Sequence, residues 1–164
     1  MAELGRTWTP LREVLREFWN TNPDHRIIIV GVGRMIRGDE STGLLIADEV
    51  AKMNHHNTLV IKAEDRPENY TEQIRHFNPT HILYLLATRS GRAPGETRLI
   101  TLEEHSRKSL HESPLTTLDH YLSTILSAKT RLLIVEPWTE MGEPSQFLKK
   151  AARRIAEDII TSLP

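Results

Sequence analysis

The chain has 164 residues, and 38% of them are hydrophobic, so its length and composition suit one compact domain with a single core. Lys and Arg together number 21 and Asp and Glu 22, a balance that predicts no global electric field to hold a nucleic acid or an anionic membrane. The sequence contains no cysteine, which excludes disulfides, thiolate zinc sites and cysteine nucleophiles. No segment approaches the roughly 18 apolar residues of a membrane span or resembles a signal peptide, so we expect a soluble, cytoplasmic protein without membrane insertion.

The first part of the chain is expected to form a helix and then a strand. Hydrophobic residues recur at helical spacing over residues 11–18, with Thr9 as a candidate N-cap and Pro10 in the first helical position. We therefore expect residues 1–25 to be an N-terminal helical extension. Residues 27–30 are three isoleucines and a valine between Arg26 and Gly31, the pattern of a strand buried on both faces.

Strands and helices then alternate along the chain. The hydrophobic pattern predicts helices over residues 44–53, 67–77, 118–126 and 145–163, and strands over residues 58–61, 81–86 and 131–135. The last helix is expected to bury a stripe of six hydrophobic residues, Phe147, Leu148, Ala151, Ala152, Ile155 and Ile159.

One further strand is expected to run in the opposite direction. Residues 89–95 are rich in turn formers and lead directly into a strand at residues 97–100, which leaves no room for a crossover helix. The sequence therefore predicts a single α/β domain over residues 1–164, a three-layer sandwich with a mostly parallel five-stranded sheet and one antiparallel strand.

Ligands bind beyond the carboxyl ends of the strands in such sheets, so the loop after the first strand is a candidate site. Gly33 and Gly38 have the five-residue offset of a P-loop, but Asp39 and Glu40 stand where a lysine and a hydroxyl residue would bind phosphate and magnesium. Ile36 replaces the third glycine of a dinucleotide motif. The acidic pair suits either a metal cation or the N-cap of the next helix, and the loop alone leaves both interpretations open.

The same loop resembles a motif of the nickel-iron hydrogenase maturation endopeptidases, G-x-G-N-x-x-x-x-D-D/E-x-x-G after the first strand. The chain matches this motif at Gly31, Gly33, Asp39, Glu40 and Gly43 and has Arg34 in place of the asparagine. Two later segments are also similar to family segments: Ala93-Pro94-Gly95 resembles an A/N-P-G turn, and His111-Glu112-Ser113-Pro114-Leu115 resembles an H-x-x-P-L segment.

The resemblance implies an endopeptidase that removes the C-terminal extension of a nickel-iron hydrogenase large-subunit precursor after nickel insertion. The family's metal ligands fall on Glu40 and His111, which are also the implied catalytic residues, and Asp39 is a further candidate ligand. It implies that these side chains contact nickel supplied by the substrate, where the metal polarises the scissile carbonyl or activates water. Without the resemblance, a lone histidine beside Glu112 would more often be an ordinary surface residue.

The chain departs from the family at one metal ligand. The family has an aspartate at the end of the third strand, and this position is Leu86, which cannot bind metal. A site with only Glu40 and His111 would hold a metal weakly unless another group contributes. Asp39, Glu64, Asp65 and Glu112 are candidates for that contribution by loop position. A second interpretation therefore stays open, a non-catalytic protein that binds the precursor but has lost hydrolysis.

Overall fold

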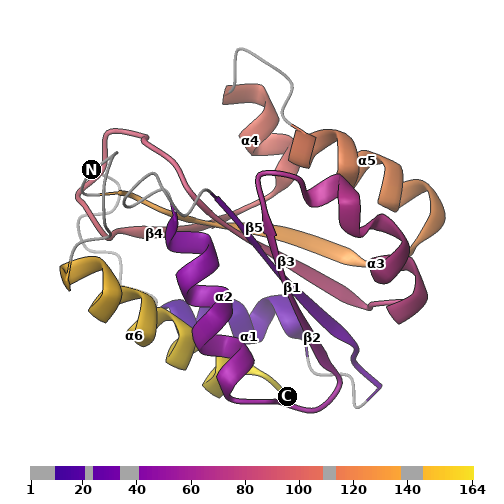
Figure 1. Ribbon diagram of the computed structural model, residues 1–164, viewed down its shortest axis with the longest axis horizontal. Helices are drawn as coiled ribbons and strands as arrows, with labels where there is room; N and C mark the ends of the chain where they lie inside the picture. Colours follow the sequence, from indigo (N-terminus) through magenta and orange to yellow (C-terminus); the bar gives the residue numbers. More distant parts are fainter. Residues whose placement is uncertain (1–9, 21–23, 34–40, 109–113, 138–145) are drawn as a thin grey trace.

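The computed structural model describes residues 10–20, 24–33, 41–108, 114–137 and 146–164 (Figure 1). The helices in this part of the chain are α1 (Leu11–Trp19), α2 (Thr42–Lys52), α3 (Thr71–Phe77), α4 (Leu102–Lys108), α5 (Pro114–Ile125) and α6 (Gln146–Ser162), with a 3₁₀ helix over Pro67–Tyr70. The strands are β1 (Ile27–Val32), β2 (Thr58–Glu64), β3 (His81–Ala87), β4 (Thr97–Ile100) and β5 (Lys129–Val135). Across the described ranges, no helix is long and apolar enough to cross a lipid bilayer.

The strands form one five-stranded sheet in the order β2-β1-β3-β5-β4. β1, β2, β3 and β5 are parallel, and β4 pairs with β5 in the antiparallel direction. Helices α1, α2 and α6 cover one face of the sheet, and α3, α4 and α5 cover the other (Figure 1). The structure confirms the predicted three-layer sandwich, including its single antiparallel strand.

β1 lies between two hydrophobic cores, one on each face of the sheet. All six of its residues are buried, and alternate side chains point to opposite faces of the sheet. Ile27 and Ile29 pack in the cluster beneath α1, α2 and α6, whereas Ile28 and Val30 pack in the cluster beneath α3, α4 and α5. This two-sided burial explains the uninterrupted hydrophobic run in the sequence.

The structure corrects the predictions at the two terminal helices. Pro10 is the N-cap of α1 and has extended backbone angles (φ −58°, ψ 146°), so the helix begins one residue later than expected; Thr9 lies outside the described residues. Phe147 is 74% exposed and is not part of the core stripe of α6. At 100° per residue the buried stripe is centred near Leu148 and Ala152, and Phe147 lies about 110° away from that centre.

Candidate active site at the carboxyl edge of the sheet

The three predicted metal-site residues, Asp39, Glu40 and His111, lie outside the described residues. Their mutual approach therefore stays a prediction. The structure describes the chain on either side of both segments, which is enough to locate where each segment is attached. Glu40 directly precedes Ser41, which is fully buried, and His111 precedes the first turn of α5, where Leu115 is buried.

The N-terminus of α2 is held against the carboxyl ends of β1 and β3 by two glycines. A Cβ atom added to Gly43 would collide with the carbonyl oxygens of Val32 and Leu85, and one added to Gly31 would collide with the carbonyl oxygen of Gly43 and the side chain of Ala47. Because only hydrogen occupies these positions, helix and strands approach without a gap. The glycines of the motif thus place the start of α2 at this edge of the sheet.

The N-terminus of α5 lies at the same edge, on the opposite face. α5 ends at Ile125 and β5 begins at Lys129, so the two run in opposite directions. The 12-residue helix is about 18 Å long and the seven-residue strand about 23 Å, so the start of α5 lies beside the carboxyl third of β5. Leu115 belongs to the same hydrophobic cluster as Val32 and Ile134. The described starts of α2 and α5 therefore both lie at the carboxyl edge.

Leu86 lies between these two attachment points. It aligns with Ile134 across β3 and β5, and its partly buried side chain packs against the cluster on the α5 face. The position thus faces the layer of α4 and α5. Within the described ranges, no group of three or more His, Asp or Glu side chains is arranged to hold a metal ion.

The end of β2 also supports the loop after β1. Glu64 has a left-handed backbone (φ 55°), and its carbonyl accepts a hydrogen bond from the Gly33 N–H at 2.9 Å. The side chains of Glu64 and Asp65 are exposed. A non-glycine residue in this conformation is strained by about 1 kcal/mol or more, so the backbone contact to Gly33 holds it in place.

Glu136 is a functional candidate that the sequence interpretation missed. It directly follows β5, is only 4% exposed, and accepts hydrogen bonds from the Ser90 hydroxyl at 2.7 Å, the Ser90 N–H at 3.0 Å and the Arg92 N–H at 3.3 Å. Burial alone raises the pKa of Glu136, but these hydrogen bonds and the charge of Arg89 outweigh it, and the net pKa is lowered. The carboxylate is therefore ionised and ties the loop after β3 to the end of β5.

The backbone completes this connection between the two loops. The Gly95 N–H donates to the carbonyl of Glu136 at 2.7 Å, and the Glu136 N–H donates to the carbonyl of Glu96 at 3.0 Å. One signal for Glu136 was present in the sequence, since an acidic residue that follows a hydrophobic strand stands where sites form in parallel sheets.

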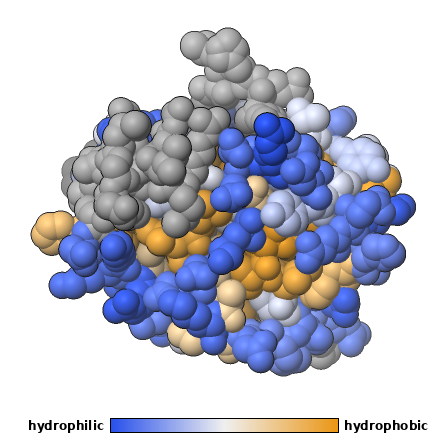
Figure 2. Space-filling view, viewed as in Figure 1, coloured by the Kyte–Doolittle hydropathy of each residue, from blue (hydrophilic) through white to orange (hydrophobic). Residues whose placement is uncertain are grey.

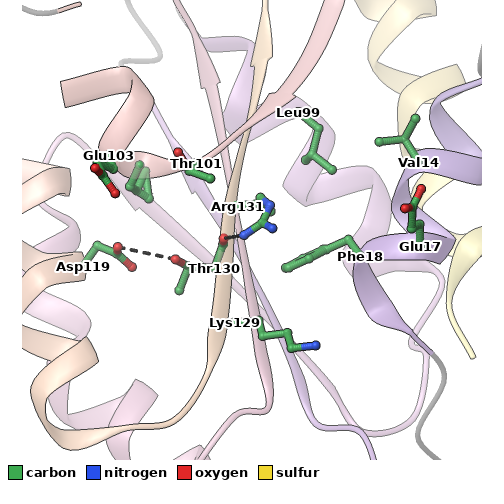
Figure 3. A pocket seen from close by; sticks show the side chains of 11 residues that line it. Val14, Glu17, Phe18, Leu99, Thr101, Glu103, Asp119, Lys129, Thr130 and Arg131 are labelled. Carbon is green, nitrogen blue, oxygen red and sulfur yellow. Dashed lines mark hydrogen bonds between the residues drawn. The ribbon is translucent and has the colours of Figure 1, made fainter. Parts of the chain in front are cut away.

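A cavity of about 660 Å³ lies away from this edge (Figure 3). β4 pairs only with residues 132–135 of β5, so residues 129–131 form an open strand edge along the cavity. Asp119 points into it from α5 and accepts hydrogen bonds from Thr130 and Tyr84, both at 3.4 Å. Burial raises the pKa of Asp119, and the two hydrogen bonds only partly offset that effect. The cavity borders the opposite half of β5 from Glu136, so it is separate from the candidate active site.

Known proteins are similar to this chain in sequence and in fold. No family model matches the sequence. The chain superimposes on the crystal structure of the NiFe hydrogenase maturation protease HycI from Thermococcus kodakarensis with a TM-score of 0.83 and 26% identity, over 92% of this chain and 98% of that one. The hydrogenase 3 maturation protease of Escherichia coli K12 is 34% identical over 91 residues, which cover 54% of this chain and 58% of that protein. In sequence and in fold, this chain is similar to NiFe hydrogenase maturation proteases.

A second solved structure gives the same result. The solution structure of the endopeptidase HycI from Escherichia coli matches this chain with a TM-score of 0.71 and 27% identity, over 80% of this chain and 87% of that one. Gly31 and Gly43 of the matched motif have a structural reason, because they set the closeness of α2 to the strand ends. The ligand roles of Glu40 and His111 stay predictions.

Proposed function

We propose that this protein is an endopeptidase that removes the C-terminal extension of a NiFe hydrogenase large-subunit precursor after nickel insertion. The observation that carries the proposal is that α2 and α5 both begin at the carboxyl edge of β1, β3 and β5. The segments that contain the motif residues Glu40 and His111 are attached there from opposite faces. The relatives named as maturation proteases favour cleavage over the alternative of a non-catalytic binding protein. We place the reaction in the cytoplasm.

The nickel belongs to the substrate in this proposal. Glu40 and His111 contact the nickel of the precursor, with Asp39 beside them, because carboxylate and imidazole are suitable nickel ligands. The precursor's nickel would supply Lewis-acid chemistry at the scissile peptide. Leu86 cannot contribute a third ligand, so the protease alone binds nickel weakly and the precursor completes the site. Glu136 holds the loop after β3 in position through its hydrogen bonds with Ser90.

The proposal is tested with purified protease and precursor. The precursor is prepared with and without nickel, and release of the C-terminal peptide is followed by mass spectrometry. We expect cleavage only of the nickel-loaded precursor, with a loss of activity of about 100-fold or more in Glu40→Gln and His111→Ala, since each removes a ligand. His120→Ala, on the exposed surface of α5, is the matched control and should retain full activity.

Two results would overturn parts of the proposal. Tight binding of the loaded precursor without cleavage would support the non-catalytic protein. Equal cleavage of nickel-free precursor, unaffected by both substitutions, would remove Glu40 and His111 from the mechanism.

A further inference from the structure

The first turn of α6 exposes a large aromatic side chain to solvent. Phe147 is 74% exposed, more than any other large hydrophobic side chain in the described part of the chain; Met53 and Tyr121 follow at 49%. The surrounding surface over α6 is mostly hydrophilic (Figure 2). An exposed phenylalanine buries little of its ring on folding, and phenylalanine is enriched in protein interfaces, where aromatic rings bury a large area.

Two cations share the helix face of Phe147. Lys150 and Arg154 follow it by three and seven residues, which places all three side chains within about 60° of one another around the helix. Both cations are exposed, and neither forms an ion pair with another described residue, whereas the adjacent Arg153 pairs with Glu49 of α2 at 3.2 Å. We call Phe147, Lys150 and Arg154 the α6 stripe.

The α6 stripe begins at the same end of the molecule as the candidate active site. Leu45 of α2 and Lys149 of α6 line the same small cavity. Four residues later in each helix, Glu49 of α2 pairs with Arg153 of α6, so the two helices run in the same direction. Phe147 is six residues, or about 9 Å, before Arg153, and Thr42 is seven residues before Glu49. The starts of the two helices therefore lie at one level, beside the carboxyl edge.

We propose that the α6 stripe is the docking surface for the protein substrate of this protease, an inference that rests on the proposed function. The proposed substrate is a protein, and contacts remote from the scissile bond contribute binding energy that holds such a substrate at the site. The matching surface on the precursor would have an apolar recess that receives Phe147. Asp or Glu side chains around this recess would pair with Lys150 and Arg154.

The test measures KM and kcat for nickel-loaded precursor. In Phe147→Ser we expect KM to rise about 10-fold or more with kcat unchanged, because truncation of an interface anchor weakens binding and leaves the reacting groups in place. The double variant Lys150→Glu/Arg154→Glu should also raise KM, and the increase should shrink as salt is raised from 50 to 500 mM, which screens exposed charges. Neither change should lower the melting temperature, since all three side chains are exposed.

Two control variants match these changes elsewhere on the surface. Tyr121→Ser on α5 removes another exposed aromatic ring, and Arg16→Glu reverses an exposed charge on α1; both should leave KM unchanged. If the wild-type protein cleaves the precursor and the stripe variants keep the wild-type KM, the docking surface is wrong while the proposed function stands. If the wild-type protein cleaves nothing, the proposed function fails, and direct binding of loaded precursor by calorimetry still decides whether the stripe is needed.

Discussion

The charged carboxylate of Glu136 stabilises the loop after β3 near the candidate site. Glu136→Gln keeps the size of the side chain but removes the charge and turns one acceptor into a donor that faces the Ser90 and Arg92 N–H groups. We expect a loss of unfolding free energy of about 1–3 kcal/mol at pH 7, measured by urea denaturation. Glu68→Gln, exposed in the 3₁₀ helix, is the control and should change little.

The effect of Glu136→Gln should depend on pH in a defined direction. The folded-state pKa of Glu136 is lowered from an ordinary value of 4.5, so its contribution is present above that value and is lost as pH falls through the folded-state pKa. The difference between wild type and variant should therefore be full at pH 7 and shrink below about pH 4.5. A difference that grows on acidification would contradict the bonding of an ionised carboxylate.

Leu86 is the residue that separates this chain from the family pattern. Leu86→Asp should increase the affinity of the isolated protein for Ni²⁺, measured by calorimetry, because it adds a carboxylate at the end of β3 where the family ligand aligns. It should also reduce the unfolding free energy by about 1–3 kcal/mol, since Leu86 packs against the hydrophobic cluster on the α5 face. Leu86→Asn has similar size without the charge, and nickel affinity equal in both variants would show that the alignment is wrong.

The start of α2 packs closely against the ends of β1 and β3 at Gly43. Adding one methyl group at Gly43 tests whether this close packing is needed. Gly43→Ala would place a Cβ atom against the backbone carbonyls of Val32 and Leu85, which cannot move aside as a flexible side chain can. We expect a loss of about 1–3 kcal/mol of unfolding free energy and a decrease in precursor cleavage, because α2 must shift together with the attached segment. Ala51→Ser, on the exposed side of α2, should affect neither. Full activity in Gly43→Ala would mean that the site does not depend on this contact.

The elements were largely predictable because their signals are local. Strand burial follows from the hydrophobic run of β1, and the direction of β4 follows from a connection too short for a crossover. Phe147 precedes Ala151 by one helical turn and so stands at the margin of the hydrophobic pattern, but it lies about 110° from the centre of the buried stripe and is exposed. Glu136 escaped prediction because its partner Ser90 is 46 residues away and only the folded loops bring them together. The mutual position of Glu40 and His111 stays a prediction.

In the whole molecule, α1 and α6, the first and last described helices, pack together. Leu15, Phe18 and Trp19 of α1 pack in the same hydrophobic cluster as α2 and α6. The Trp19 Nε1–H donates a buried hydrogen bond to the Ser162 hydroxyl at 2.8 Å, across 143 positions of sequence. The helix expected as an extension thus contributes directly to the core, and we propose that residues 10–164 unfold as one unit.

This proposal predicts how stability responds at both ends of the chain. Trp19→Ala removes a fully buried ring and should reduce the unfolding free energy by about 3–5 kcal/mol, and Ser162→Ala, which leaves the indole N–H unpaired, by about 1–2 kcal/mol. The double variant should lose less than the sum, because Ser162 has no indole partner once Trp19 is gone. Circular dichroism and calorimetry should follow a single coincident transition in the wild type. An early, separate transition that Trp19→Ala abolishes without changing the main one would show instead that α1 is an independently unfolding extension.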